Sequence, residues 1–355
     1  MSGGWRVAVA VAVLATAGGP GTTAAQMADE PLEFGGLFQT GFRADPDETG
    51  RTNGFEVFAA RGLARGGVGL VFDYFVQAEY RTYDETFRLL DAYVTLPVIP
   101  ELAVTLGLFR PEFGLEALLD RGELTFLERA QADLLIAPGR QVGVSAGGGA
   151  FDGRLTYGAG FFNGNGPSLQ NDGDDYMFAG RVMYNSIGTI AFYDDFVIQV
   201  GGSIGYSSDT SAPLFGDLVS EPSFDPPAAA IRYAGSRLLL GADVQASYRD
   251  FTLTGEYYGA DYTPDPGGEL PDDASAHGGY VEAGYRAYGV LELVTRWDAF
   301  KPAVGDDRQF LLFGLNVYPG VYTKIGVQYA VALEDAAPAL PVAGDQFIVV
   351  AQLAF

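Results

Sequence analysis

The charged residues between Leu106 and Gly143 are the part of this sequence best suited to act on a solute. The stretch, LGLFRPEFGLEALLDRGELTFLERAQADLLIAPGRQVG, sets four arginines and six carboxylates among apolar residues. Arginine binds oxyanions through two parallel N–H bonds, and rings of charge around a narrow passage select ions by their sign. We therefore expect a pore constriction that is lined by Arg110, Glu112, Glu116, Arg121, Glu128, Arg129 and Arg140.

Two conformations of this segment are consistent with its sequence. It could form a short helix over the rim of the protein, with Glu112 and Glu116 in solvent. We favour instead a loop, residues 111–139, that folds into the interior, because loops of about thirty residues in a compact domain are uncommon and usually functional. Apolar side chains would pin this loop against the inner wall; they are Phe109, Phe113, Leu115, Leu118, Leu119, Phe126 and Leu127.

The rest of the chain consists of short runs in which apolar and polar residues alternate. Leu238, Leu240 and Val244 fall on one face of such a run, and Asp243 and Gln245 fall on the other. A period of two predicts strands with one apolar face and one polar face. The strands are expected at 32–43, 54–65, 68–81, 87–97, 101–110, 140–151, 153–163, 176–186, 195–207, 236–249, 250–262, 278–287, 289–300, 307–318, 320–333 and 345–355.

The connections between these strands alternate in length. Those at Gly66-Gly67, Arg249-Asp250 and Pro319 are short, and those at 111–139 and 208–235 are long. The connection 187–194 falls among the short ones but is somewhat longer than the others. A bacterial outer-membrane barrel has an even number of antiparallel strands, short periplasmic turns and longer external loops. A soluble sandwich has no reason to sort its loops in this way. We therefore expect an all-β, transmembrane antiparallel barrel of about 16 strands with an inward-folded third external loop.

The two ends of the chain are consistent with export to a membrane. Arg6, the apolar run Val7–Ala17 and the small residues before Ala25 predict a signal peptide over residues 1–25. Residues 26–355 would then form the barrel, because no later run approaches the ~18 apolar residues of a spanning helix. The last strand alternates up to Phe355, and a terminal phenylalanine resembles the insertion signal of outer-membrane barrels.

The composition excludes several classes of function. A net charge of −24 argues against nucleic acid as a partner, because such a chain cannot neutralise phosphates along a strand. The absence of cysteine excludes disulfides and thiolate metal sites. His277 is the only histidine, so a histidine-based metal site or nucleophilic triad lacks its parts. We expect no enzymatic activity and no cofactor.

Several motifs resemble the phosphate-selective porin O and P family. They are GLFRPEFGLE, LTFLER and APGRQVGVSAGG within 107–148, then LTYGAGFFNGNG (Leu155–Gly166) and AGRVMYN (Ala179–Asn185). The resemblance implies a porin of the bacterial outer membrane with 16 strands, a homotrimer, in which the third external loop folds inward. It also implies phosphate selection by lumen arginines and a lysine-rich constriction, whereas this chain has only two lysines, Lys301 and Lys324.

Charges on the strands would face the lumen. The inward basic set comprises Arg43, Arg61, Arg65, Arg81, Arg154, Arg181, Arg286, Arg296, Arg308 and Lys324. The acidic set comprises Asp73, Glu79, Asp91, Asp243, Glu256, Glu282, Glu292 and Asp298. Opposed tracks of charge would produce a transverse field that orients polar solutes. Alternatively, these charges pair with one another and stiffen the wall.

The sequence thus predicts passive diffusion of small hydrophilic solutes or ions, with an anion or phosphate preference implied by the resemblance. A general or cation-preferring channel is the alternative that the acidic charge favours, and a non-conducting barrel that anchors the envelope or binds a surface partner is another. The expected partners are the lipid bilayer, lipopolysaccharide and further copies of the chain. Calcium in the external loops is a further expectation, with oxygens from Asp172, Asp174, Asp175, Asp261, Asp265, Asp272 and Asp273.

Overall fold

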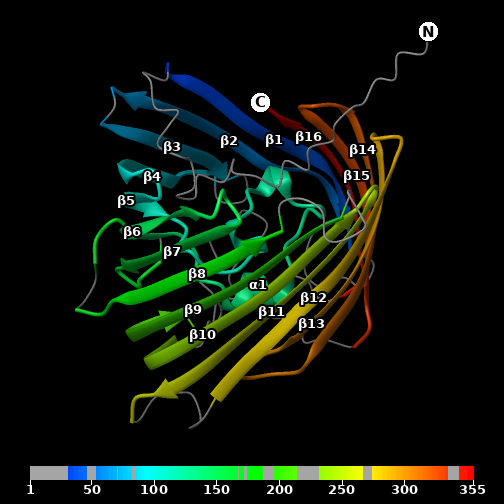
Figure 1. Ribbon diagram of the computed structural model, residues 1–355. Helices are drawn as coiled ribbons and strands as arrows, with labels where there is room; N and C mark the ends of the chain where they lie inside the picture. The colour runs from blue at the N-terminus through cyan, green and yellow to red at the C-terminus, as the bar shows by residue number, and fades with distance from the viewer. Residues whose placement is uncertain are drawn as a thin grey trace.

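A closed antiparallel barrel makes up the computed structural model (Figure 1). The structure describes residues 31–45, 53–69, 71–81, 85–166, 168–171, 174–186, 196–213, 232–266, 274–334 and 344–355. The predicted signal peptide, residues 1–25, lies outside these ranges. No helix among the described residues is long and apolar enough to cross a membrane.

Sixteen strands form the barrel, and the predicted strand count and antiparallel topology are confirmed. Their bounds are β1 (Glu33–Ala44), β2 (Gly54–Val68), β3 (Phe72–Arg81), β4 (Thr86–Ile99), β5 (Leu102–Phe109), β6 (Gln141–Ala150), β7 (Leu155–Phe162), β8 (Met177–Asn185), β9 (Phe196–Pro213), β10 (Arg232–Tyr248), β11 (Phe251–Pro264), β12 (Ala274–Ala287), β13 (Leu291–Lys301), β14 (Arg308–Gly320), β15 (Thr323–Ala332) and β16 (Gln346–Ala354). Each strand pairs with its neighbour in sequence, so short turns alternate with longer connections at the two rims.

The first and last strands close the sheet. β1 pairs with β16 from Leu37 opposite Ala354 onwards. Below this ladder, Gly36 N donates to the Phe355 carbonyl at 2.8 Å, and Phe355 N donates to the Gly36 carbonyl at 3.0 Å. Closure pairs the backbone N–H and C=O groups that an open edge would leave unpaired. A strand in the hydrocarbon core of a membrane needs this pairing, because no water is present to bind those groups.

The two faces of the sheet have opposite chemistry. Large apolar side chains are exposed on the outside, with Phe161 at 62% and Leu253 at 52% of their surface. Charged side chains are buried on the inside, where Arg61 and Glu79 are 6% and 0% exposed. Soluble monomers rarely expose apolar area on this scale, which is typical of a surface that faces lipid.

The connection between β5 and β6 occupies the interior of the barrel (Figure 1). It contains two 3-10 turns, η2 (Glu116–Leu118) and η3 (Arg121–Glu123), and the helix α1 (Gln131–Ile136). All six residues of α1 are buried, and the helix packs against β11, β12 and β13. We call residues 110–140 the inner segment.

Candidate functional site

The inner segment contacts opposite parts of the barrel wall. Near its start, Gly114 N donates to Ser203 Oγ on β9 at 3.1 Å. Further along, Lys324 Nζ on β15 donates to the Leu124 carbonyl at 2.7 Å. The segment therefore crosses the bore and leaves a cross-section narrower than that of an empty barrel.

Apolar packing fixes the beginning and the end of the inner segment. The ring of Phe113 lies 5.9 Å from that of Tyr258 on β11, and both side chains are fully buried. The cluster around them comprises Phe113, Ala117, Ala132, Leu134, Leu135, Ile136, Ala137, Tyr233, Leu239, Tyr258, Ala260, Tyr262, Ala274, Ala276 and Phe300. Each Å² of apolar area buried contributes about 25 cal/mol, and this burial stabilises the docking of the segment.

Gly114 permits the close approach of Phe113 to the wall. Its φ is +74°, in the left-handed region that favours glycine, and a Cβ there would collide with the Tyr258 hydroxyl. The tight backbone turn and the packing of the neighbouring ring therefore both depend on this residue.

A second apolar contact holds the middle of the segment. Leu127 packs with Phe58, Ile348 and Val350 on the walls of β2 and β16. Of the anchors expected from the sequence, Phe113, Phe126 and Leu127 are fully buried. Phe109 is also buried but belongs to a separate cluster with Tyr93, Phe162, Met177 and Ala179.

Between these apolar contacts, wall side chains bind peptide groups of the inner segment. Asn316 donates to the Thr125 carbonyl at 3.1 Å, and Leu127 N donates to Gln328 Oε1 at 2.9 Å. Gln352 likewise donates to a segment carbonyl, that of Gly122, at 2.9 Å. Each bond satisfies a backbone group that burial would otherwise leave unpaired.

Glu256 on β11 clamps the first turn of the segment. Its carboxylate accepts hydrogen bonds from the backbone N–H groups of Leu115 and Glu116, the latter at 3.0 Å. Tyr280 adds a third bond from its hydroxyl at 3.2 Å. The carboxylate thus binds the backbone at the start of η2 and does not form an ion pair among the described residues.

Arg296 on β13 is the main ionic link between wall and segment. Its Nη2 donates to Glu116 Oε1 at 2.6 Å and to Glu282 Oε2 at 2.7 Å. The guanidinium also lies between two aromatic rings, 4.5 Å from the centroid of Tyr280 and 5.0 Å from that of Phe126. Ion pairing and cation–π contact together hold this arginine in one position.

Two arginines of the inner segment bind groups within the segment itself. Arg110 donates to the Leu119 carbonyl at 2.5 Å, and Arg129 donates to the Leu119 and Glu116 carbonyls. Arg129 also pairs with Asp133 at 3.3 Å. These two guanidinium groups therefore act as internal braces.

Other expected pore residues connect the segment to the wall. Arg121 donates to Gln39 Oε1 at 2.8 Å, and Arg140 pairs with Asp91 at 3.0 Å. Glu128 accepts a bond of 2.7 Å from Arg43. Pairs within the wall follow the same pattern, including Arg61–Glu79 at 2.7 Å and Arg181–Asp243 at 2.6 Å.

The sequence comparisons bear directly on this arrangement. Residues 34–189, which include the inner segment, match the family described as Phosphate-selective porin O and P. Together with the closed barrel of sixteen strands, this match supports an outer-membrane porin. Comparison with curated proteins found no match.

Solved structures share the fold of the porin at low identity. The loop L8 deletion mutant of OmpT, an outer membrane protein of Vibrio cholerae, aligns with a TM-score of 0.65 and 10% identity over 92% of this chain and 99% of its own. The trimer form of in-vitro folded OmpT from the same organism gives 0.63 and 12% over 92% and 100%. The anion-selective porin from Comamonas acidovorans gives 0.63 and 13% over 92% and 100%.

Some expected lumen residues of the porin lie elsewhere. Arg154 was expected on an inward strand face but is exposed in the turn 151–154, because β7 begins only at Leu155. Arg65 reaches the end of β2, where it is half exposed and pairs with Glu33 at 2.8 Å. Arg308 begins β14 and is buried. The side chain of Arg81 lies outside the described residues.

Two carboxyl groups of the inner segment have raised pKa values. Removal from water raises the pKa of Glu112 to about 7, and the charge of Arg181 opposes this shift. Removal from water also raises the pKa of Asp133 to about 6, which Arg129 opposes and Glu116 reinforces. Glu112 packs over β7, since a Cβ at Gly158 would lie 2.7 Å from the Glu112 Cγ.

The sequence did not single out the wall residues that bind the inner segment. Glu256 and Asp298 were expected only as members of an acidic track, and Tyr258 was not among the residues named. The available signal was the alternation in β11, where Glu256, Tyr258 and Ala260 share the inward face. That pattern places a side chain in the lumen without showing which part of the loop it will meet.

The expected calcium sites of the external loops stay a prediction. Among the described residues, no group of three or more histidine or acidic side chains could hold a metal ion. Asp172, Asp272 and Asp273 lie outside the described residues.

Proposed function

We propose that this porin allows passive diffusion of small hydrophilic solutes and ions through a bore narrowed by the inner segment. A barrel of sixteen strands is wide enough to enclose an aqueous channel. The contact that carries the proposal is the ionic and aromatic link from Arg296 to Glu116, which holds the segment across the lumen. Permeation then requires only a width and a charge pattern.

The charge pattern supports a general or cation-preferring channel. The arginine forks at Arg43, Arg61, Arg140, Arg181 and Arg296 already pair with carboxylates. Glu256 and Asp298 instead accept backbone N–H bonds and have no ion-pair partner among the described residues. A lumen of this kind attracts cations.

Anion or phosphate preference is the second candidate. Arg121 of the inner segment and Lys324 on β15 donate to neutral oxygens, those of Gln39 and the Leu124 carbonyl. The solved porin from Comamonas acidovorans is described as anion-selective. These two cations are the groups by which this chain would attract phosphate.

The proposed partners are the lipid bilayer, lipopolysaccharide and two further copies of the chain. The apolar outer face supports the bilayer, and the trimer form of OmpT supports a homotrimer. β5 and β7 have eight residues each, whereas a strand tilted through a membrane needs about 9–11. Contact between copies would cover this short part of the wall.

Planar-bilayer recording tests the proposal. Purified protein should produce steady ohmic steps, and its reversal potential under a potassium chloride gradient gives the ion preference. A membrane that stays silent after insertion of heat-modifiable, folded barrel would favour the non-conducting anchor instead. We expect no enzymatic activity, which incubation with generic peptidase and esterase substrates would check.

A further inference from the structure

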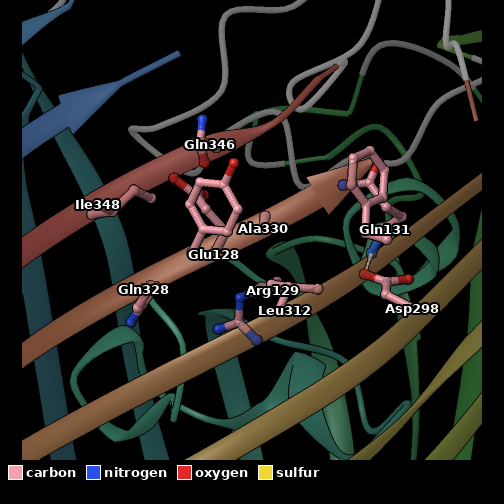
Figure 2. A pocket seen from close by; sticks show the side chains of 11 residues that line it. Glu128, Arg129, Gln131, Asp298, Leu312, Gln328, Ala330, Gln346 and Ile348 are labelled. Atoms are coloured by element: carbon pink, nitrogen blue, oxygen red, sulfur yellow. Dashed lines mark hydrogen bonds between the residues drawn. The ribbon is translucent and has the colours of Figure 1, made fainter. Parts of the chain in front are cut away.

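A small pocket lies between the inner segment and the wall formed by β13, β14, β15 and β16 (Figure 2). Its cavity volume is about 30 Å³. Gln131 and Asp298 meet at one end, as Figure 2 shows, and Gln328 lies along the lining. The apolar part of the lining comes from Phe310, Leu312 and Ile348.

Asp298 is a buried carboxylate with little compensation. Its side chain is 3% exposed, and its Oδ2 accepts a hydrogen bond of 2.9 Å from the backbone N–H of Gln131. It makes no ion pair among the described residues, and its Oδ1 has no hydrogen-bond partner among them. A buried charge in this state is costly unless a proton or a cation neutralises it.

Two glutamine side chains that line the pocket also have a hydrogen-bonding atom without a partner among the described residues. Gln131 is 3% exposed, and its Oε1 has no partner among the described residues. Gln328 accepts the Leu127 N–H through its Oε1, which leaves its Nε2 as an unused buried donor among those same residues. The end of the pocket where Gln131 and Asp298 meet (Figure 2) therefore offers two acceptors without a hydrogen-bond partner in the described part of the chain.

The nearby cations are engaged by other carboxylates. Arg129 pairs with Asp133, and Arg296 pairs with Glu116 and Glu282. Glu128, which also lines the pocket, pairs with Arg43. Asp298 has no such ion-pair partner among the described residues.

We propose that Asp298 Oδ1 and Gln131 Oε1 bind a monovalent alkali cation in this pocket. One carboxylate and one neutral amide provide the single negative charge that such an ion balances, and their two oxygens replace part of its hydration shell. Divalent ions, which take six or more oxygens with several carboxylates, do not match this donor set.

The inference rests on the proposed function, since it gives the diffusion channel a resting position for the permeating cation. A cation held beside α1 neutralises the wall where the inner segment docks.

Anomalous diffraction from crystals grown in rubidium chloride tests the site directly. We expect a rubidium peak between Asp298 Oδ1 and Gln131 Oε1 in the unaltered porin. Asp298→Asn should abolish the peak, and Gln131→Met should reduce it several-fold while leaving its own backbone N–H in place. Glu112→Gln, which removes a carboxylate beside β7, is the matched control and should leave the peak height unchanged.

Absence of the peak at saturating rubidium, or a peak unchanged by Asp298→Asn, would overturn the cation site in favour of a protonated Asp298. The Gln131→Met variant keeps the test decisive if Asp298→Asn does not fold. Bilayer conductance of the same samples separates the two proposals. If the porin conducts but shows no rubidium peak, only the cation site is refuted. If the folded barrel does not conduct, the proposed channel function is refuted.

Discussion

Arg296 Nη2 and Glu116 Oε1 lie 2.6 Å apart and join the barrel wall to the inner segment. Both side chains are almost fully buried, at 3% and 2% exposure. Glu116 also accepts the Ala130 N–H at 2.7 Å, so this single carboxylate connects the wall, η2 and the start of α1.

Replacing Glu116 by alanine should loosen the inner segment. Removing one partner of a buried pair costs about 3–5 kcal/mol, because it leaves a buried charge and unpaired donors. We expect larger and noisier single-channel currents, and faster proteolysis within residues 110–140 of intact barrels. Arg65→Met is the control, because its pair with Glu33 is half exposed and such pairs contribute roughly 0–1 kcal/mol. Equal currents from Glu116→Ala and the unaltered porin would show that the pair does not hold the segment.

Gly114→Ala should weaken the docking of Phe113. The left-handed backbone costs a residue with a Cβ about 1–2 kcal/mol, and the collision with the Tyr258 hydroxyl adds to that. Limited proteolysis and thermal melting of the purified barrel measure the effect. Gly54→Ala is the control, since nothing lies within 4 Å of a Cβ at that position. Identical proteolysis of the two variants would contradict this explanation.

The charge of Glu112 should make ion preference depend on pH. Its pKa is raised from the ordinary 4.5 to about 7, so it gains its negative charge only as pH passes through 7. We expect the reversal potential to move towards the cation side between pH 6 and pH 8. Glu112→Gln should remove most of that movement. A pH shift of the same size in the variant would assign the titration to another group.

The same shift also has a consequence for stability. The folded chain holds its proton on Glu112 more tightly than the unfolded chain does, so this group favours folding below pH 4.5. That contribution is lost as pH rises from 4.5 to about 7. Melting curves of the unaltered porin and Glu112→Gln, compared at pH 5 and pH 8, should converge at the lower pH. Divergence in the opposite direction would show that Arg181 keeps the carboxylate ionised.

Lys324→Gln separates the two ion preferences. If Lys324 attracts anions, its loss should lower chloride permeability relative to potassium by several-fold and shift the reversal potential accordingly. Lys301→Gln is a matched control, because the only other lysine lies exposed at the end of β13. Identical reversal potentials in both variants would leave the general channel as the better description.

Much of the barrel could be predicted from the sequence because alternation and turn length are local signals. The predicted strand 54–65 begins where β2 begins, and the last strand falls within two residues of β16 at its start. Larger differences occur at β9, which continues to Pro213, and at β12, which begins at Ala274. Small and polar residues at these ends, such as SSDTSAP in β9, weaken the alternation although the ladder continues.

The site was less accessible to sequence reasoning, because its geometry depends on contacts between distant residues. The anchors Phe113 and Leu127 could be recognised by their apolar character. Their partners Tyr258 and Ile348 could not, since nothing local connects them to the loop. Arg154 was misplaced for a simpler reason, because the alternating pattern does not show where β7 begins.

Four wall side chains form hydrogen bonds with peptide groups of the inner segment. The pairs are Gln352 with Gly122, Lys324 with Leu124, Asn316 with Thr125, and Gln328 with Leu127. These hydrogen bonds hold the backbone of the inner segment, so they do not involve the side chains of the residues that they bind. Substitutions at Glu123 and Thr125, whose side chains are not buried, can therefore change what the bore admits while the inner segment stays in place.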